Sequence, residues 1–126
     1  MRVTTTNDTV EALIAAYFEG LYHSDAAALA YVFHPRAMYF DTTSEPRLVL
    51  SMAEYLPIVA RRASPASRGE PRRDEIVEIR QLGPDLAFAH VRCALGARRF
   101  QDALTCAREA GRWQIVAKAF HYDLES

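Results

Sequence analysis

The apolar residues near the start of the chain recur with the spacing of one face of an α-helix. Six of them stand at positions i, i+3, i+4, i+7, i+8 and i+11: Val10, Leu13, Ile14, Tyr17, Phe18 and Leu21. Asp8, followed three residues later by Glu11, has the form of a capping box that would begin this helix. The pattern therefore predicts a helix that starts at about Asp8 and ends near Tyr22 or His23.

Two further helices are expected before residue 63. Ser24 is a candidate cap for a short helix that passes through Leu29, Val32 and Phe33 and ends at Pro35. The pair Ser51 and Glu54 forms a second capping box, which predicts a helix from about Met52 to Arg62. Pro57 lies inside that segment and is expected to kink the helix or to shift its start. Between these helices, the runs "AMYFD" (37–41) and "RLVL" (47–50) are typical of short strands.

From Asp74 onward the apolar period changes from that of a helix to the alternation of a β-strand. Four extended runs follow one another, at residues 75–82, 86–95, 100–109 and 112–124, and only short turns separate them. Hairpin-sized turns between alternating runs are typical of an antiparallel meander. We therefore predict one α+β domain over residues 1–126, with three N-terminal helices packed on a curved, mainly antiparallel sheet.

Length and composition agree with one soluble domain. Half of the 126 residues are apolar, a quarter are charged, and the formal net charge is −1. A nucleic-acid-binding protein usually has a basic face, and we expect no nucleic-acid partner. The basic cluster between residues 61 and 73 contains acidic residues as well, and we interpret it as a solvated loop with its flanks.

The sequence also argues against several kinds of site. Cys93 and Cys106 lie in apolar runs without metal-ligand spacing, so we expect buried free thiols in a reducing compartment. The histidines show no metal motif, and no glycine-rich phosphate loop or nucleophile motif is present. No apolar run is long enough for a membrane span or a signal peptide. We expect a cytoplasmic protein with no metal, cofactor or membrane partner.

The order of elements and several phrases resemble the nuclear transport factor 2-like superfamily, also described as cystatin-like or SnoaL-like. The similar phrases are "YFEGLYHSDAAALAYVFHP" (17–35), "LSMAEYL" (50–56) and "RRFQDALTCAREAGRWQIVAKAFHYD" (98–123). Within the superfamily the chain looks most like the putative lumazine-binding branch. The resemblance implies a cone of curved sheet around a pocket, and a homodimer packed through the sheet faces. It leaves function open, because this fold serves enzymes and binding modules alike.

A more distant resemblance, to the ketosteroid isomerases, implies two catalytic candidates. Their oxyanion-hole tyrosine falls on Tyr17, and their general-base aspartate falls on Asp41. Their second oxyanion donor, a protonated aspartate, falls near Ala103 or Leu104, with Asp102 adjacent. A desolvated carboxylate at Asp41 would suit proton abstraction next to a carbonyl, and the Tyr17 hydroxyl would suit a developing enolate oxygen. The alternative is structural: Asp41 would start the turn that follows it, and Tyr17 would be a core residue.

The strand at residues 86–95 has two different faces. Ala87, Ala89, Val91 and their neighbours of the same parity are small and apolar, and suit a position beneath helices. The other face, with Phe88, His90 and Arg92, is expected to line either the edge of the pocket or a dimer interface.

The last strand places Lys118 in an apolar run. A three-residue turn at 109–111 would put Lys118 directly opposite Asp102, as a cross-strand ion pair, whereas a two-residue turn would oppose it to Ala103. Strict alternation puts Lys118 and Phe120 on one face and His121 on the other. Lys118 is either a structural partner of Asp102 or a cation in the pocket.

The function expected from the sequence is the binding of a small, flat organic ligand inside the cone. The expected polar and aromatic lining comprises Tyr17, Tyr39, Asp41, Phe88, His90, Arg92, Asp102, Lys118 and Phe120. The name of the branch implies a pterin-like or lumazine-like molecule. The competing hypothesis is a cofactor-independent isomerase, cyclase or dehydratase, with Asp41 as the base and Tyr17 as the oxyanion donor.

Overall fold

The computed structural model describes residues 7–125 as three helices and six strands, in the order that the sequence predicts. The elements are α1 (Val10–Tyr22), α2 (Ala26–Val32), β1 (Phe33–Asp41), β2 (Leu48–Ser51), α3 (Met52–Arg61), β3 (Glu75–Gly83), β4 (Leu86–Leu95), β5 (Arg98–Glu109) and β6 (Arg112–Leu124). Each of the four extended runs predicted after Asp74 is a strand.

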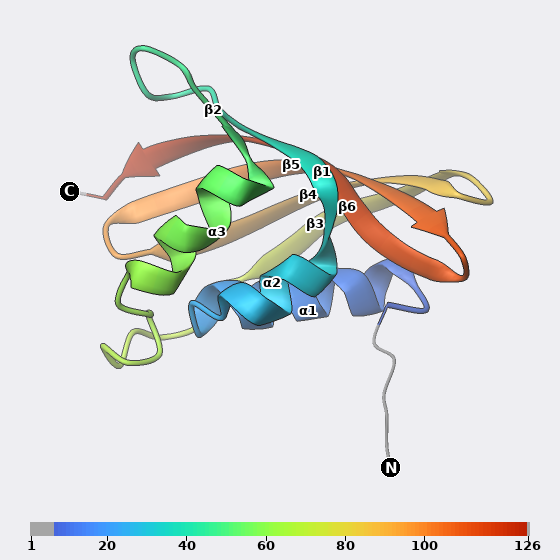
Figure 1. Ribbon diagram of the computed structural model, residues 1–126. Coiled ribbons are helices and arrows are strands. Elements are labelled where there is room, and N and C mark those ends of the chain that lie inside the picture. Colours follow the sequence, from blue (N-terminus) through green and yellow to red (C-terminus); the bar gives the residue numbers. More distant parts are fainter. Residues whose placement is uncertain (1–6, 126) are drawn as a thin grey trace.

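The six strands form one sheet in the order β2-β1-β6-β5-β4-β3. All neighbouring pairs are antiparallel except β1 and β6, which are parallel. Figure 1 shows that the sheet is curved and that the three helices lie on one side of it. The α+β class, with N-terminal helices on a mainly antiparallel sheet, is therefore confirmed.

The starts of the first two helices differ from the sequence prediction by one residue. Thr9, rather than Asp8, caps α1, because its side chain accepts a hydrogen bond from the amide of Ala12. Asp25, rather than Ser24, caps α2 by accepting from the amide of Ala28. In both cases the side chain used is the one whose oxygen reaches the amide three residues ahead.

The segment after α2 enters the sheet earlier than predicted. The strand β1 begins at Phe33, not Ala37, and includes Pro35, which was expected to follow a helix end. Ser51 and Glu54 form the predicted capping box of α3, and this helix begins at Met52 with Pro57 inside it. Pro57 does not shift the start of the helix.

The core lies between the helices and the inner face of the sheet. The apolar stripe of α1 is buried there, as predicted, and so are the small residues of β4, Ala87, Ala89 and Val91. Gly20 lies where α1 meets α2, and a Cβ built on it would lie 2.5 Å from Cδ2 of Leu29. Both cysteines are free and buried, in agreement with the sequence prediction.

The register between β5 and β6 corrects the predicted pairing of Lys118. The turn has two residues, since Glu109 pairs with Arg112, but the ladder slips by one residue between Thr105 and Cys106. Lys118 therefore lies opposite Leu104, and Asp102 opposite Phe120. The extra residue in β6 is Val116, which has no partner in the β5–β6 ladder.

The same bulge changes which side chains of β6 face inward. Before it, Trp113 and Ile115 are buried; after it, Lys118 and Phe120 are buried. Strict alternation had placed these two pairs on opposite faces. A single inserted residue reverses the parity of everything beyond it, and so both pairs face the core.

Candidate functional site

A hydrogen bond between α1 and β5 organises the polar part of the core. The Tyr17 hydroxyl donates to Oδ2 of Asp102 over 2.5 Å, and both side chains are buried. The other carboxylate oxygen, Oδ1, is buried and accepts no hydrogen bond from the described protein atoms. Asp102 therefore keeps a buried acceptor atom that no donor of the described residues satisfies.

Lys118 lies beside this pair and is surrounded by rings. Its ammonium nitrogen is 5.1 Å from the ring centre of Tyr17, 5.4 Å from Tyr39, 5.6 Å from Tyr55 and 5.3 Å from Phe120. These distances allow cation–π attraction to each ring. The side chain is buried, with 6% of the residue exposed. Among residues 7–125 no ion pair joins Lys118 to Asp102, so the predicted direct cross-strand pair is replaced by an indirect arrangement through the rings and Tyr17.

The charges of this cluster follow from its surroundings. Burial alone would lower the pKa of Lys118, but Tyr55 and the Asp102 carboxylate raise it above the ordinary lysine value. Burial first, and Asp102 second, raise the pKa of Tyr17 well above its ordinary value. At neutral pH the cluster thus contains an ammonium group, on Lys118, and a neutral phenol, Tyr17, whose hydroxyl donates a hydrogen bond to Asp102.

The cluster borders a small cavity that leads to a wider mouth. The inner cavity, of about 20 Å³, is lined by Asp102, Lys118, Phe120 and their neighbours, and has room for about one water molecule. A depression of about 230 Å³ adjoins it and shares with it Tyr39, Arg62, Leu95 and Phe100. The two hollows thus have four side chains in common, and Lys118 lines the inner one.

The mouth is cationic, which sequence reasoning missed. Arg62, Arg68 and Arg98 line it, together with Tyr39, Ala63, Pro65, Leu95 and Phe100. Arg62 and Arg68 belong to the basic cluster that the sequence presents as a solvated loop, while Arg98 lies on the β4–β5 hairpin. The available signal was the concentration of arginines after α3, but only the fold brings Arg98 to the same place.

Asp41 lies near this region but its carboxylate is already used. It accepts hydrogen bonds from the amide of Thr43 over 2.9 Å, the amide of Ser44 over 3.0 Å and the hydroxyl of Ser44 over 2.6 Å. Burial alone would raise its pKa, but these hydrogen bonds outweigh burial and lower the pKa below the ordinary aspartate value. The geometry is that of a turn-forming aspartate, which was the structural alternative for this residue.

The structure separates the remaining predicted residues into two groups. Tyr17, Tyr39, Asp102, Lys118 and Phe120 meet on the inner side of the sheet. The predicted residues of β4 alternate with its buried residues and so point to the outer face: Phe88, His90 and Arg92. His90 Nε2 lies 2.6 Å from Oε1 of Gln101 on β5, and Arg92 contacts Glu75 on β3. The β4 residues therefore do not share a cavity with Lys118.

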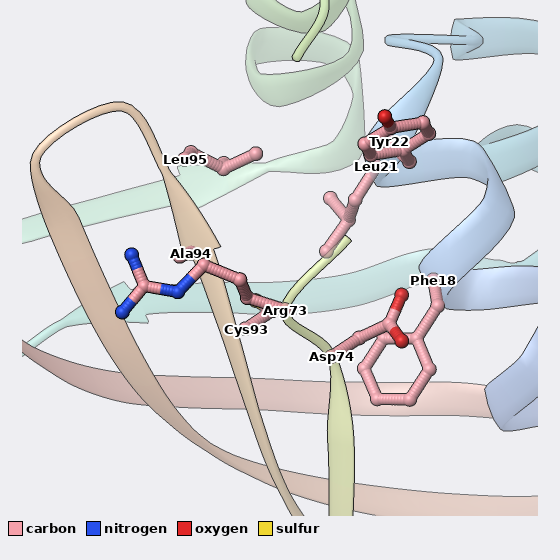
Figure 2. Close-up of a pocket in the computed structure, with 8 residues that line it drawn as sticks. All are labelled: Phe18, Leu21, Tyr22, Arg73, Asp74, Cys93, Ala94 and Leu95. Carbon is pink, nitrogen blue, oxygen red and sulfur yellow. The ribbon is translucent and has the colours of Figure 1, made fainter. Parts of the chain in front are cut away.

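A separate small pocket lies beside the inner cavity. Figure 2 shows Phe18, Leu21 and Tyr22 of α1 facing the end of β4, with the Arg73 side chain pointing away from Leu21 and Tyr22. Its volume is about 20 Å³ and most of its lining is apolar. This space is a packing gap between α1 and β4 rather than a second ligand site.

Two further kinds of site have no support in the described part of the chain. Within residues 7–125 no group of three or more histidine, cysteine, aspartate or glutamate side chains is arranged to hold a metal ion. No helix in the same range has both the length and the apolar character needed to cross a membrane.

Comparisons with known proteins agree with this geometry. The model of the family described as "Putative lumazine-binding" matches residues 5–121. A structure similar to this one is a nuclear transport factor 2-like protein of unknown function from Silicibacter pomeroyi DSS-3, with a TM-score of 0.80 and 23% identity over 90% of this chain and 92% of that chain. Another, of the same description, comes from Shewanella baltica OS155, with a TM-score of 0.76 and 20% identity over 90% of each chain.

A third similar structure is described as ketosteroid isomerase-like. It comes from Erwinia carotovora atroseptica SCRI1043 and has a TM-score of 0.70 and 16% identity over 95% of this chain and 98% of that chain. The sequence matches no curated protein. At these identities the structural matches establish the fold.

Proposed function

Since this chain belongs to the putative lumazine-binding family of nuclear transport factor 2-like proteins, we propose that it binds a small, flat organic molecule in the pocket of its curved sheet. The observation that carries the proposal is the position of Lys118, buried among four rings and lining a small cavity that shares four side chains with a surface depression. An ammonium group so placed costs free energy to bury and gives the core no packing that an apolar residue would not give. Its presence supports a role in ligand binding.

The polar atoms around the inner cavity and the mouth support the same role. Oδ1 of Asp102 and two guanidinium nitrogens of Arg62, Nε and Nη2, are buried without a hydrogen bond among the described residues. A binding pocket typically combines apolar and aromatic walls with a few such convergent polar groups. Here the walls are Tyr39, Leu95 and Phe100. Of the polar groups, Asp102 lines the inner cavity and Arg62 lines both the cavity and the mouth.

Amide spectra recorded during ligand titration test this proposal. Lumazine and a set of one- and two-ring heteroaromatic compounds are added to ¹⁵N-labelled protein, and the expected shifts lie at Tyr39, Leu95, Phe100 and Lys118. A bulky side chain at the mouth, Ala63→Trp, should abolish the shifts. Ala60→Trp is the matched control, because Ala60 is an exposed residue of α3 that does not line the mouth. Binding that Ala63→Trp leaves unchanged would place the ligand elsewhere.

An isomerase, cyclase or dehydratase that uses Asp41 as its base is the second candidate. It is supported by the isomerase-like neighbour and by the burial of Asp41 at the end of β1. The lowered pKa of Asp41 and its three hydrogen bonds favour the binding function instead. The Tyr17 hydroxyl is likewise engaged, because it donates its hydrogen bond to Asp102. If a turnover is found, Asp41→Asn decides: unchanged turnover excludes Asp41 as the base.

For the outer face of the sheet we propose a second copy of this chain as the partner. Cross-strand register places exposed Met38 and Phe40 of β1 beside Ala117 and Ala119 of β6. Phe88 of β4 is two strands further along the same face. This row is largely apolar, as homodimer interfaces are. Sedimentation should show a dimer that Phe40→Glu dissociates and that Leu124→Glu, an exposed position at the end of β6, leaves intact. A monomeric wild-type protein would exclude this partner.

A further inference from the structure

Among residues 7–125, three guanidinium groups and no carboxylate line the mouth of the pocket. Arg62 comes from the end of α3, Arg68 from the loop that follows it, and Arg98 from the start of β5. Two acidic groups interact with these arginines from outside the lining. Glu70 forms an ion pair with Arg68 over 2.8 Å, and Asp41 attracts Arg98 electrostatically without direct contact. The mouth therefore carries more positive than negative charge.

Arg62 is the least satisfied of the three. Its Nε and Nη2 atoms are buried and have no acceptor among the described residues. A guanidinium group has only donors, and a buried donor without an acceptor costs free energy. The group that satisfies it must bring acceptor oxygens, and paired oxygens of a carboxylate or phosphate match the guanidinium fork.

Arg98 has a free side as well. Its guanidinium carbon is 4.6 Å from the ring centre of Tyr122, so one face of the group stacks on an aromatic ring. Within residues 7–125 neither Arg98 nor Arg62 forms an ion pair within 4.0 Å. Stacking fixes the plane of the group and leaves its N–H donors for another partner. Arg62 and Arg98 are thus two cations that line one depression and have no ion-pair partner among the described residues.

The remaining lining indicates what the anion is attached to. Tyr39 and Phe100 stand where the mouth meets the inner cavity, and Phe100 stacks edge-on with Phe120 at 5.4 Å. Aromatic walls of this kind suit a flat ring. The depression of about 230 Å³ is smaller than the pockets that hold drug-sized ligands, roughly 300–1,000 Å³. One or two rings fit this description better than a steroid.

We propose that the ligand of this pocket is a small aromatic anion whose carboxylate or phosphate binds to Arg62 and Arg98. Its ring lies between Tyr39 and Phe100 and points toward Lys118. Lys118 adds positive potential from the inner cavity, and Asp102 opposes it in part. The acidic group stays at the mouth because the inner cavity, of about 20 Å³, has room for only about one water molecule. This inference rests on the proposed function, since it names the class of ligand that the pocket takes.

Three single-ring probes test the charge requirement: benzoate, phenyl phosphate and the neutral benzamide. Each is titrated to about 10 mM while the amide spectrum is recorded, which detects even weak binding. We expect the two anions to bind about tenfold or more tightly than benzamide, and to shift Tyr39, Leu95 and Phe100. The tighter of the two anions identifies carboxylate or phosphate as the preferred group.

Substitutions of the two arginines complete the test. Arg62→Gln and Arg98→Gln should each weaken benzoate and phenyl phosphate by about tenfold and leave benzamide unchanged. Two positions are needed because Arg62 also terminates α3. Arg80→Gln is the matched control, because Arg80 is exposed on β3 and pairs with Glu78.

The outcomes separate this inference from the proposed function. Benzamide that binds in the pocket as tightly as benzoate would overturn the anion requirement and leave the ligand-binding function standing. Anion binding that neither arginine substitution weakens would do the same. The absence of pocket shifts with all three probes would count against both proposals.

Discussion

The hydroxyl of Tyr17 on α1 donates a 2.5 Å hydrogen bond to the Asp102 carboxylate on β5, and so ties a helix to the centre of the sheet inside the core. Tyr17→Phe removes this donor. Among the described residues no other N–H or O–H group donates to the Asp102 carboxylate, and the Cys93 thiol lies farther away. A hydrogen bond to a charged group contributes about 1.5–3 kcal/mol, and we expect the free energy of unfolding to fall by that amount. Urea denaturation measures the change.

Tyr31→Phe is the control for that substitution. The Tyr31 ring is exposed and its hydroxyl forms no hydrogen bond with the described residues, so its loss should change stability by less than about 0.5 kcal/mol. Equal stability of the two variants would show that the Tyr17–Asp102 bond contributes nothing net to the fold.

The turn after β1 should make stability depend on acid pH through Asp41. Hydrogen bonds from Thr43 and Ser44 lower the pKa of the folded carboxyl, so its contribution is complete above the unfolded value of about 4 and is lost as the pH falls through the lower, folded value. Asp41→Asn should therefore be less stable than the wild type at pH 7. Unfolding curves between pH 2 and pH 7 should show the two proteins converging at the acid end, and a difference that stays constant with pH would contradict this assignment.

The contact between the first two helices should be intolerant of a methyl group at Gly20. An alanine Cβ there would lie 2.5 Å from Cδ2 and 2.8 Å from Cγ of Leu29, and Leu29 is fully buried and cannot easily move. Overpacking of this kind costs about 1–3 kcal/mol, which exceeds the gain in helix propensity of about 1 kcal/mol over most of that range. Thermal unfolding of Gly20→Ala should show a lower Tm. Gly83→Ala is the control, because a Cβ at Gly83 meets nothing within 4 Å.

The two thiols should be unreactive in the folded protein. Burial raises the pKa of Cys106 to about 12, and burial followed by Asp102 raises that of Cys93 still further. Because the thiolate is the reactive form, a thiol reagent at pH 8 should label neither residue until the protein is unfolded in guanidinium chloride. Rapid labelling of one thiol under native conditions would show that its strand opens locally.

Local patterns were enough to predict most of the fold. The stripe of α1 and the Ser51–Glu54 box of α3 depend on residues three or four apart, and the alternation in β4 depends on every second residue. These signals are contained in short segments, so they survive without knowledge of the partner elements. The first two helix caps were wrong by one residue because Asp8, Thr9, Ser24 and Asp25 are all competent caps, and the final choice depends on backbone geometry.

The candidate site was predictable only in part. Tyr17, Tyr39, Asp102, Lys118 and Phe120 were singled out and do meet, but the arginines of the mouth were not. The alternation of β4 predicts which face lies beneath the helices, but it does not tell whether the other face, with Phe88, His90 and Arg92, lines the pocket or the outside of the sheet.

The sequence alone determined the elements and their order, because periodicity and turn residues act over short distances along the chain, and its resemblance to known sequences indicated the family. Only the tertiary structure decided the register of β6, where Val116 is accommodated as a bulge that brings Lys118 and Phe120 into the core. Only it placed Arg98 of a hairpin beside Arg62 of a distant helix end. Both outcomes depend on how the curved sheet packs against the helices. The free energy of that packing is shared among contacts between residues far apart in the sequence.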